Sequence, residues 1–217
     1  MTLRSPADGP HGPHGPHGPH DPHDPAPGTL HAWVDESLRL RAGEPGLYIL
    51  AAAVAEVSSC PPMRDSLRSL LGRRQQRLHW RDEDAPRRRK VVSLVAGADL
   101  AAVVVVGAPV DRKKQERARR MCMERLMYEL GEMSVARVLL ESRTSSLNGK
   151  DLAMVEALRG SRIMPTGLYV GHASPLAEPM LWIADAVAGA VSAARDGQHE
   201  FVTGIKHLVM TIEIPVR

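Results

Sequence analysis

The segment 99–110, with the sequence DLAAVVVVGAPV, constrains the fold more than any other part of the chain. It is rich in β-branched residues and almost continuously apolar. Strands that helices cover on both faces have this character, whereas strands with one face in water alternate between apolar and polar residues. The sequence therefore predicts a central strand in a sheet with helices on both sides.

The remaining segments complete an α/β domain. Residues 31–37 and 47–57 have strand character and are separated by the turn sequence RAGEPG, so they predict an antiparallel hairpin. An Arg-rich helix should then run from Pro61 to about Arg77, and a second helix should begin near Pro86, because proline is favoured at the first helical position. After strand 99–110 the patterns predict helix 112–130, strand 135–142, helix 149–159 capped by Asn148, strand 162–171, helix 178–195 and a closing edge strand within 207–217. The expected fold is a mixed sheet flanked by helices, with an Arg-rich helical insertion after the second strand.

The N-terminal segment has a different character. Residues 11–25 read HGPHGPHGPHDPHDP, a repeat with a period of three residues. Its prolines lack a backbone donor, and it offers no apolar side chain to bury, so we expect a disordered linker. The predicted organisation is a tail over residues 1–28 and one folded domain over 29–217. The regularly spaced histidines could also bind Zn²⁺ or Ni²⁺ loosely, which would make the tail a metal store.

Cysteine usage and hydropathy limit the location of the protein. Cys60 and Cys122 are the two cysteines, and their spacing is not that of a metal site or a disulfide framework, so we expect reduced thiols. The sequence MTLRSPADGP lacks the apolar core of a signal peptide. The most apolar run, from Leu100 to Ala108, is far shorter than the roughly 20 residues of a membrane helix. We therefore expect a cytoplasmic protein without a membrane partner.

Basic residues are concentrated in two blocks, although the net charge is only +3. Segment 64–90 holds ten Lys and Arg against four Asp and Glu, and segment 112–125 holds seven against two. Blocks of this kind on an otherwise acidic chain are typical of proteins that bind a polyanionic partner, although the solvent-facing sides of two helices would have the same composition. The candidate residues for contacts with nucleic-acid phosphates are Arg73, Arg74, Arg87, Arg88, Arg89, Lys113 and Lys114.

Acidic residues interrupt apolar segments at three places. Asp35 and Glu36 lie within the first strand, Glu141 ends the strand VARVLLE, and Asp185 is the only charge in PMLWIADAVAGAVSAA. Ionised carboxylates in apolar surroundings are costly unless a positive group compensates them. A pair of Mg²⁺ or Mn²⁺ ions would do so, and two-metal phosphoryl chemistry needs such convergent carboxylates. The candidate metal ligands are Asp35, Glu36, Glu141 and Asp185.

Each of these acids also has a purely structural interpretation. Asp185 could form a salt bridge to a basic residue such as Arg143, and Glu141 could face solvent at the end of its strand. Neighbours on a strand face opposite sides, so Glu36 could point away from Asp35. His79, in RLHWRDED, is a candidate for relaying a proton or orienting water, or it could simply pack with Trp80. His172, just before the helix of Asp185, could line the site, or it could be a half-buried structural histidine.

Four short motifs carry a resemblance to a known family. VDES on the first strand, the apolar second strand, LHW after the Arg-rich segment and LWIADAVAGAV near the end together resemble the domain-of-unknown-function family 3800, over roughly residues 30–195. That family is grouped with ribonuclease H-like nucleases. The resemblance implies a ribonuclease H-like sheet in which Asp35, Glu141 and Asp185 match the carboxylate positions of the fold.

The sequence also departs from that family. Leu38 stands where glycine usually follows DES, and Trp182 stands where glutamine often precedes the aspartate. The middle acid is Glu141 where aspartate is commoner. The helix-borne glutamate of ribonuclease H has no clear counterpart, although Glu124 and Glu129 lie on the corresponding helix. These departures leave room for an altered metal site.

Two functions follow from these patterns. The first is metal-dependent phosphodiester cleavage of nucleic acid by a two-metal carboxylate site, with Asp35, Glu141, Asp185 and His79 as the catalytic residues and Mg²⁺ or Mn²⁺ as the cofactor. The second is a non-catalytic nucleic-acid-binding or interaction module on the same fold. The low aromatic content, 3% of residues, argues against recognition of single strands by base stacking.

Overall fold

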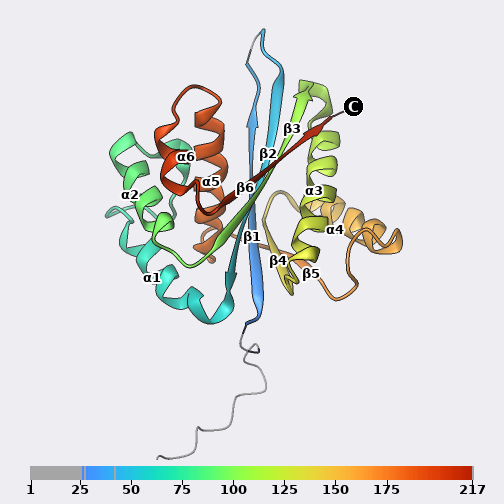
Figure 1. Ribbon diagram of the computed structural model, residues 1–217, viewed down its shortest axis with the longest axis horizontal. Coiled ribbons are helices and arrows are strands. Elements are labelled where there is room, and N and C mark those ends of the chain that lie inside the picture. Colours follow the sequence, from blue (N-terminus) through green and yellow to red (C-terminus); the bar gives the residue numbers. More distant parts are fainter. Residues whose placement is uncertain (1–25, 27, 42, 217) are drawn as a thin grey trace, which may run out of the picture.

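The computed structural model describes residues 26, 28–41 and 43–216. Its centre is a six-stranded sheet with the strand order β5-β4-β1-β2-β3-β6. The strands are β1 (Leu30–Arg39), β2 (Gly46–Glu56), β3 (Ala101–Val110), β4 (Arg137–Glu141), β5 (Tyr169–Ala173) and β6 (Val209–Pro215). Figure 1 shows this sheet standing between two layers of helices.

One strand runs against all the others. β2 is antiparallel to both β1 and β3, whereas β4 is parallel to β1, β5 is parallel to β4 and β6 is parallel to β3. The carboxyl ends of every strand except β2 therefore meet at one edge of the sheet. In open α/β sheets, sites usually form outside this edge.

The helices divide between the two faces of the sheet. α1 (Cys60–Ser69), α2 (Ala85–Ala96), α5 (Met180–Ala194) and α6 (Glu200–Ile205) cover one face, and α3 (Gln115–Glu132) and α4 (Ser145–Gly160) cover the other (Figure 1). Short 3₁₀ turns lie at Val57–Ser59 (η1), Trp80–Asp82 (η2) and Arg112–Lys114 (η3). None of the helices in the described part of the chain has the length and apolar character that crossing a bilayer requires.

The sheet separates two hydrophobic clusters. Trp33 of β1 belongs to the cluster under α1, α2, α5 and α6, whereas its neighbour Val34 belongs to the cluster under α3 and α4. Side chains alternate along a strand. Asp35 consequently lies on the α5 side of the sheet and Glu36 on the α3 side.

The predicted fold class, a mixed sheet flanked by helices, is confirmed, as are the antiparallel hairpin of β1 and β2 and the buried strand at β3. Two helices, α1 and α2, follow the second strand. The tail predicted over residues 1–28 lies almost wholly outside the described residues, and the boundary of the folded domain stays a prediction.

Some element boundaries were predicted wrongly. α1 ends at Ser69 rather than near Arg77, because the polar run that begins at Gly72 has no apolar face to bury. α4 begins earlier than predicted, and its N-cap is Thr144, whose hydroxyl accepts from the backbone N–H of Leu147. Asn148 instead accepts from the backbone N–H of Arg143. The short helix α6 was not predicted, and β5 begins later than its predicted segment 162–171 and extends past it to Ala173.

Candidate active site at the carboxyl edge of the sheet

Two carboxylates meet where β4 parts from β1. The parallel ladder between these strands ends at the pair Val34–Leu140, and the next residues along the chain are Asp35 and Glu141. Both residues line a hollow of about 200 Å³ that also involves Glu36, Ser142 and other neighbours. The sequence places both acids here because each directly follows the last apolar residue of its strand's ladder.

The third carboxylate, Asp185, comes from α5. A Cβ atom at Gly189, one turn later on this helix, would lie only 2.2 Å from Cδ1 of Trp80, so the glycine lets the indole rest against the helix backbone. This close approach brings the backbone N–H of Trp80 to Asp185, where it donates to Oδ2 at 2.7 Å. The aspartate and glycine of the ADAVAG motif therefore act together, one turn apart on the same face of α5.

The three acids influence one another electrostatically. Burial raises the pKa of Asp35 well above its usual range, and the nearby carboxylates of Glu141 and Asp185 raise it further. Burial also raises the pKa of Glu141, with Asp185 adding to the rise and Arg77 opposing it. These shifts mark a half-buried cluster of like charges in which a cation would be favoured.

Two basic side chains of one loop contact this cluster. Nη1 of Arg77 lies 3.3 Å from Oε1 of Glu141, and Nδ1 of His79 lies 3.1 Å from Oδ2 of Asp185. The hydrogen bond to Asp185 is the main cause that raises the pKa of His79. Asp35 has no such partner in the described residues, where its carboxylate accepts the backbone N–H of Glu36 at 2.7 Å.

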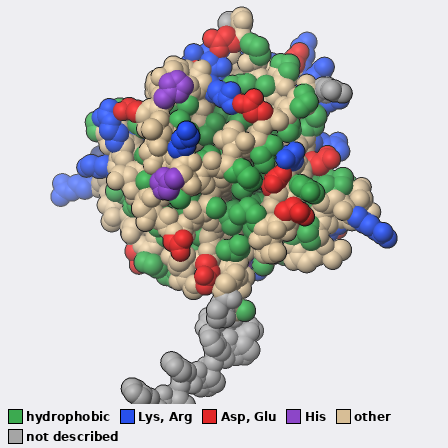
Figure 2. All heavy atoms as spheres, viewed as in Figure 1, with side chains coloured by type: hydrophobic (Ala, Val, Ile, Leu, Met, Phe, Trp, Pro, Cys, Tyr) green, Lys and Arg blue, Asp and Glu red, His purple; other side chains and the backbone are tan. Residues whose placement is uncertain are grey.

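The same loop borders a second, larger hollow. Its volume is about 670 Å³, and its lining includes Gly72, Arg73, Arg74, Arg77, His79 and Asp82. Arg77 and His79 thus belong both to this hollow and to the acidic cluster. The face of the molecule seen in Figure 2 carries acidic and basic side chains interspersed with hydrophobic ones.

Glu36 lies on the opposite face of the sheet, as its position next to Asp35 requires. It forms an ion pair with Arg119 of α3 and accepts a hydrogen bond from the hydroxyl of Tyr48. Arg119 also binds Asp151 of α4 through two hydrogen bonds of 3.0 and 2.8 Å, and both of these side chains are only 4% exposed. Glu36 therefore belongs to a structural ion-pair network, and we leave it out of the proposed metal ligands.

This network includes two more residues of interest from the sequence. Arg143 lies 2.9 Å from Asp151, and Nε2 of His172 lies 3.4 Å from it. Arg143, the salt-bridge partner considered for Asp185, therefore binds Asp151 instead, and Asp185 pairs with His79. Arg119 and Asp151 were not singled out from the sequence, because a charged residue on an amphipathic helix reads as solvent-facing.

The predicted phosphate-binding residues fall into separate groups. Arg73 and Arg74 are exposed in the loop beside the acidic cluster, and Lys113 and Lys114 are exposed in η3 on the other side of the sheet. The three arginines of α2 have partners within the protein: Arg87 binds Gln75, Arg88 lies over the Trp80 ring, and Arg89 pairs with Glu200. Among the predicted residues, Arg73 and Arg74 are the two that line a hollow together with Arg77 and His79, the residues that contact Glu141 and Asp185.

The donor set of the acidic cluster suits a hard divalent cation. Asp35, Glu141 and Asp185 offer carboxylate oxygens, which Mg²⁺ and Mn²⁺ prefer, and Asp35 forms no ion pair with another described residue, although the charges of Arg77 and Arg119 oppose the rise of its pKa. In residues 26, 28–41 and 43–216, however, no three His, Cys, Asp or Glu side chains already lie together as an ion cage. Binding a cation would therefore require side chains to converge, with Arg77 giving up its contact with Glu141, whereas the contacts of Asp185 with His79 and Trp80 are both made through Oδ2.

Comparisons with known proteins give similarity at the level of the fold. Neither a protein-family model nor a curated protein sequence matches the chain. The resemblance to family 3800 therefore rests on its motifs alone.

Several solved structures are similar to this chain. Ribonuclease H2 from Pyrococcus horikoshii OT3 is 16% identical with a TM-score of 0.45, and the match covers 81% of this chain and 76% of that one. Ribonuclease HII of Archaeoglobus fulgidus, solved in a complex with PCNA, is 14% identical with a TM-score of 0.46, covering 80% and 76%. A point mutant of Bst-RNase HIII is 13% identical with a TM-score of 0.41, covering 83% and 64%. All three TM-scores lie below 0.5, so these similarities carry no argument about the family or the activity of the chain.

Proposed function

We propose that this protein cleaves phosphodiester bonds of nucleic acid in a reaction that depends on Mg²⁺ or Mn²⁺. The observation that carries the proposal is the meeting of three carboxylates from three elements, Asp35 of β1, Glu141 of β4 and Asp185 of α5, at the carboxyl edge of the sheet. Holding several ionised carboxylates close together in partly buried surroundings costs free energy, and bound cations would offset this cost.

Each residue has a separate task in this proposal. Asp35, just past the end of the β1–β4 ladder, and Glu141, at the end of β4, would hold the cations, and Asp185 is oriented by the backbone N–H of Trp80. Bound cations would activate a water molecule and stabilise the leaving oxygen. His79 faces Asp185 through Nδ1, so its Nε2 is the ring atom available to exchange a proton with the substrate or the solvent.

The basic loop supports nucleic acid as the substrate. Arg73 and Arg74 are exposed in a hollow that Arg77 and His79 also line, where they can contact backbone phosphates without reading the base sequence. A phosphodiester held there would lie next to Arg77 and His79, which contact the acidic cluster.

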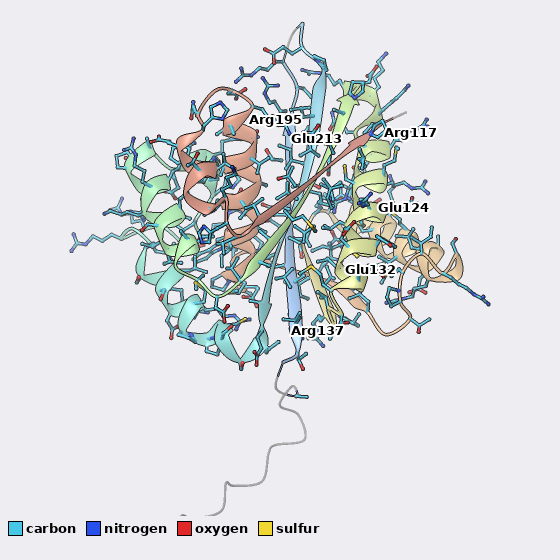
Figure 3. The ribbon with its side chains drawn as sticks, viewed as in Figure 1. Arg117, Glu124, Glu132, Arg137, Arg195 and Glu213 are labelled. Carbon is cyan, nitrogen blue, oxygen red and sulfur yellow. The ribbon has the colours of Figure 1, made fainter. Side chains whose placement is uncertain are left out.

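The test compares Asp35→Asn with a matched control, Glu132→Gln. Glu132 is an exposed acid on α3, on the other side of the sheet (Figure 3). Calorimetric titration with Mn²⁺ and cleavage of labelled DNA and RNA should be measured for both variants and the wild type. We expect Asp35→Asn to lose Mn²⁺ binding and to reduce cleavage by orders of magnitude, while the apo protein stays as stable or becomes more stable because like-charge repulsion is relieved.

Two outcomes would contradict the proposal. One is a wild-type protein that does not bind Mn²⁺ and does not cleave either nucleic acid. The other is cleavage that Asp35→Asn leaves at the level of Glu132→Gln. Nucleic-acid binding that is equal in Mn²⁺ and in chelator, without cleavage, would favour the non-catalytic binding module instead.

A further inference from the structure

The loop between α1 and η2 forms a basic hollow, and two of the residues that line it, Arg77 and His79, contact the acidic cluster. Three guanidinium groups, those of Arg73, Arg74 and Arg77, line it together with a single carboxylate, that of Asp82. Its volume of about 670 Å³ is open to solvent and exceeds that of the hollow beside Asp35, which is about 200 Å³. A hollow with this excess of arginine suits a phosphate group, which guanidinium binds in a bidentate manner.

The arginines of the hollow differ in their partners. Arg73 and Arg74 form no ion pair or hydrogen bond with any other described residue, and both are exposed. Arg77 is turned to the acidic cluster and contacts Glu141 at 3.3 Å, with the two side chains 38% and 26% exposed. Ion pairs that solvent reaches in this way contribute little to stability, so Arg77 can exchange its partner at low cost.

The frame of the loop is held independently of Arg77. Leu78 is buried, and the side-chain oxygen of Gln75 accepts from Arg87 at 2.9 Å and from the backbone N–H of Gly72 at 3.2 Å. The hollow can therefore keep its shape while the Arg77 side chain turns from one partner to the other.

We propose that this hollow binds a backbone phosphate of nucleic acid, and that Arg77 moves from Glu141 to this phosphate and thereby frees Glu141 for a divalent cation. The inference rests on the proposed function. Without nucleic acid, the Arg77 guanidinium occupies Glu141 and its charge opposes the arrival of a cation. With nucleic acid, the phosphate takes over the guanidinium. Nucleic acid and cation must then strengthen each other's binding by the same factor, because such coupling is reciprocal.

The experiment measures Mn²⁺ binding by calorimetry for the wild type, Arg77→Met, Arg77→Lys and Arg74→Met. Each is titrated alone and with a phosphorothioate oligonucleotide, which resists cleavage. Arg74→Met is the matched control, since it removes an arginine of the same loop that does not touch the acids. Thermal unfolding of each variant verifies that it is folded.

Without the oligonucleotide, we expect Arg77→Met to bind Mn²⁺ about fivefold more tightly than the wild type, because the cation no longer has to displace a solvent-exposed ion pair, and pairs of this kind are worth about this factor. Arg74→Met and Arg77→Lys should match the wild type, because both keep a positive charge beside Glu141. With the oligonucleotide, the wild type should gain about the same factor and Arg77→Met should gain much less. Arg74→Met should weaken the binding of the oligonucleotide without changing the affinity for Mn²⁺.

The results separate this inference from the proposed function. Equal Mn²⁺ affinity of the wild type and Arg77→Met without the oligonucleotide overturns the inference and leaves the nuclease proposal standing. An equal gain from the oligonucleotide in both proteins does the same. A wild type that binds no Mn²⁺ under either condition overturns both.

Discussion

Replacing Gly189 by alanine tests how α5 holds the candidate site together. The added Cβ would lie 2.2 Å from Cδ1 and 2.3 Å from Cγ of Trp80, whereas carbon atoms in good contact are about 3.5–4.0 Å apart. The indole would have to retreat by more than about 1 Å. Phe201 packs against its ring edge-to-face at 5.0 Å, and the Arg88 guanidinium lies 5.0 Å from its centre. The ring therefore has little room to yield.

The expected loss of stability combines three effects. Overpacking a core costs about 1–3 kcal/mol, and alanine recovers up to about 1 kcal/mol through its better helix propensity. Displacing Trp80 also lengthens its hydrogen bond to the Asp185 carboxylate, and a bond to a charged group contributes about 1.5–3 kcal/mol. We expect Gly189→Ala to lower the free energy of unfolding by about 2 kcal/mol and to weaken Mn²⁺ binding as well.

The matched control is Gly149→Ala. Gly149 lies within α4, and a Cβ there would meet nothing within 4 Å, so the same substitution should stabilise the protein slightly. Urea denaturation gives the free energy of unfolding of both variants, and calorimetry gives their Mn²⁺ affinity. If Gly189→Ala were as stable as Gly149→Ala, the close approach of Trp80 to α5 would not be what positions Asp185.

Two further predictions concern buried groups away from the acidic cluster. Asp151→Asn should lower the free energy of unfolding at neutral pH by about 3 kcal/mol, the lower end of the range for breaking a buried ion pair, because the buried Arg119 guanidinium loses Asp151 but keeps its ion pair with Glu36. Burial raises the pKa of Asp151, but its hydrogen bonds and ion pairs with Arg119, Arg143 and His172 outweigh this effect and lower the pKa. The wild type should therefore be more stable than Asp151→Asn above about pH 4, and this difference in the free energy of unfolding should disappear as the pH falls through the pKa of Asp151 in the folded protein. Urea denaturation at neutral and acidic pH measures it, and an advantage that persisted in acid would refute the assignment. Cys60 and Cys122 are both buried, and burial raises the pKa of the Cys122 thiol to about 12. Iodoacetamide should therefore label neither cysteine in the native protein and both in urea, which mass spectrometry can measure. Rapid labelling of the native protein would contradict this prediction.

The sheet could be predicted because its strands carry a strong local signal. The buried run around Val103–Val106 and the hairpin of β1 and β2 follow from apolar patterns and turn residues. The end of α1 was missed because Arg73, Arg74 and Arg77 are compatible with a solvated helix as well as with a loop. The loop conformation is accompanied by contacts of Gln75 with Glu83 and Arg87, which the local pattern does not indicate.

The site shows the same division. Asp35, Glu141 and Asp185 stand out in the sequence because each is a charge in an apolar context, and the structure brings their elements to one edge of the sheet. The partners of these acids could not be inferred. Arg77 and Glu141 are 64 residues apart, and His79 and Asp185 are 106 apart, so only the packing of the η2 region on α5 brings them into contact.

The opposite orientations of Asp35 and Glu36 have a consequence for mutational scanning. If the proposed function holds, an activity screen would score the two adjacent acids alike, since substitution of either would abolish cleavage. The causes would differ, because Asp35 belongs to the acidic cluster and Glu36 anchors the buried Arg119. Adding a measurement of protein abundance to such a screen would resolve the pair, with Asp35→Asn accumulating at the normal level and Glu36→Gln being depleted. Two consecutive positions of one strand would thus show, within the same screen, how a variant that loses activity differs from a variant that fails to fold.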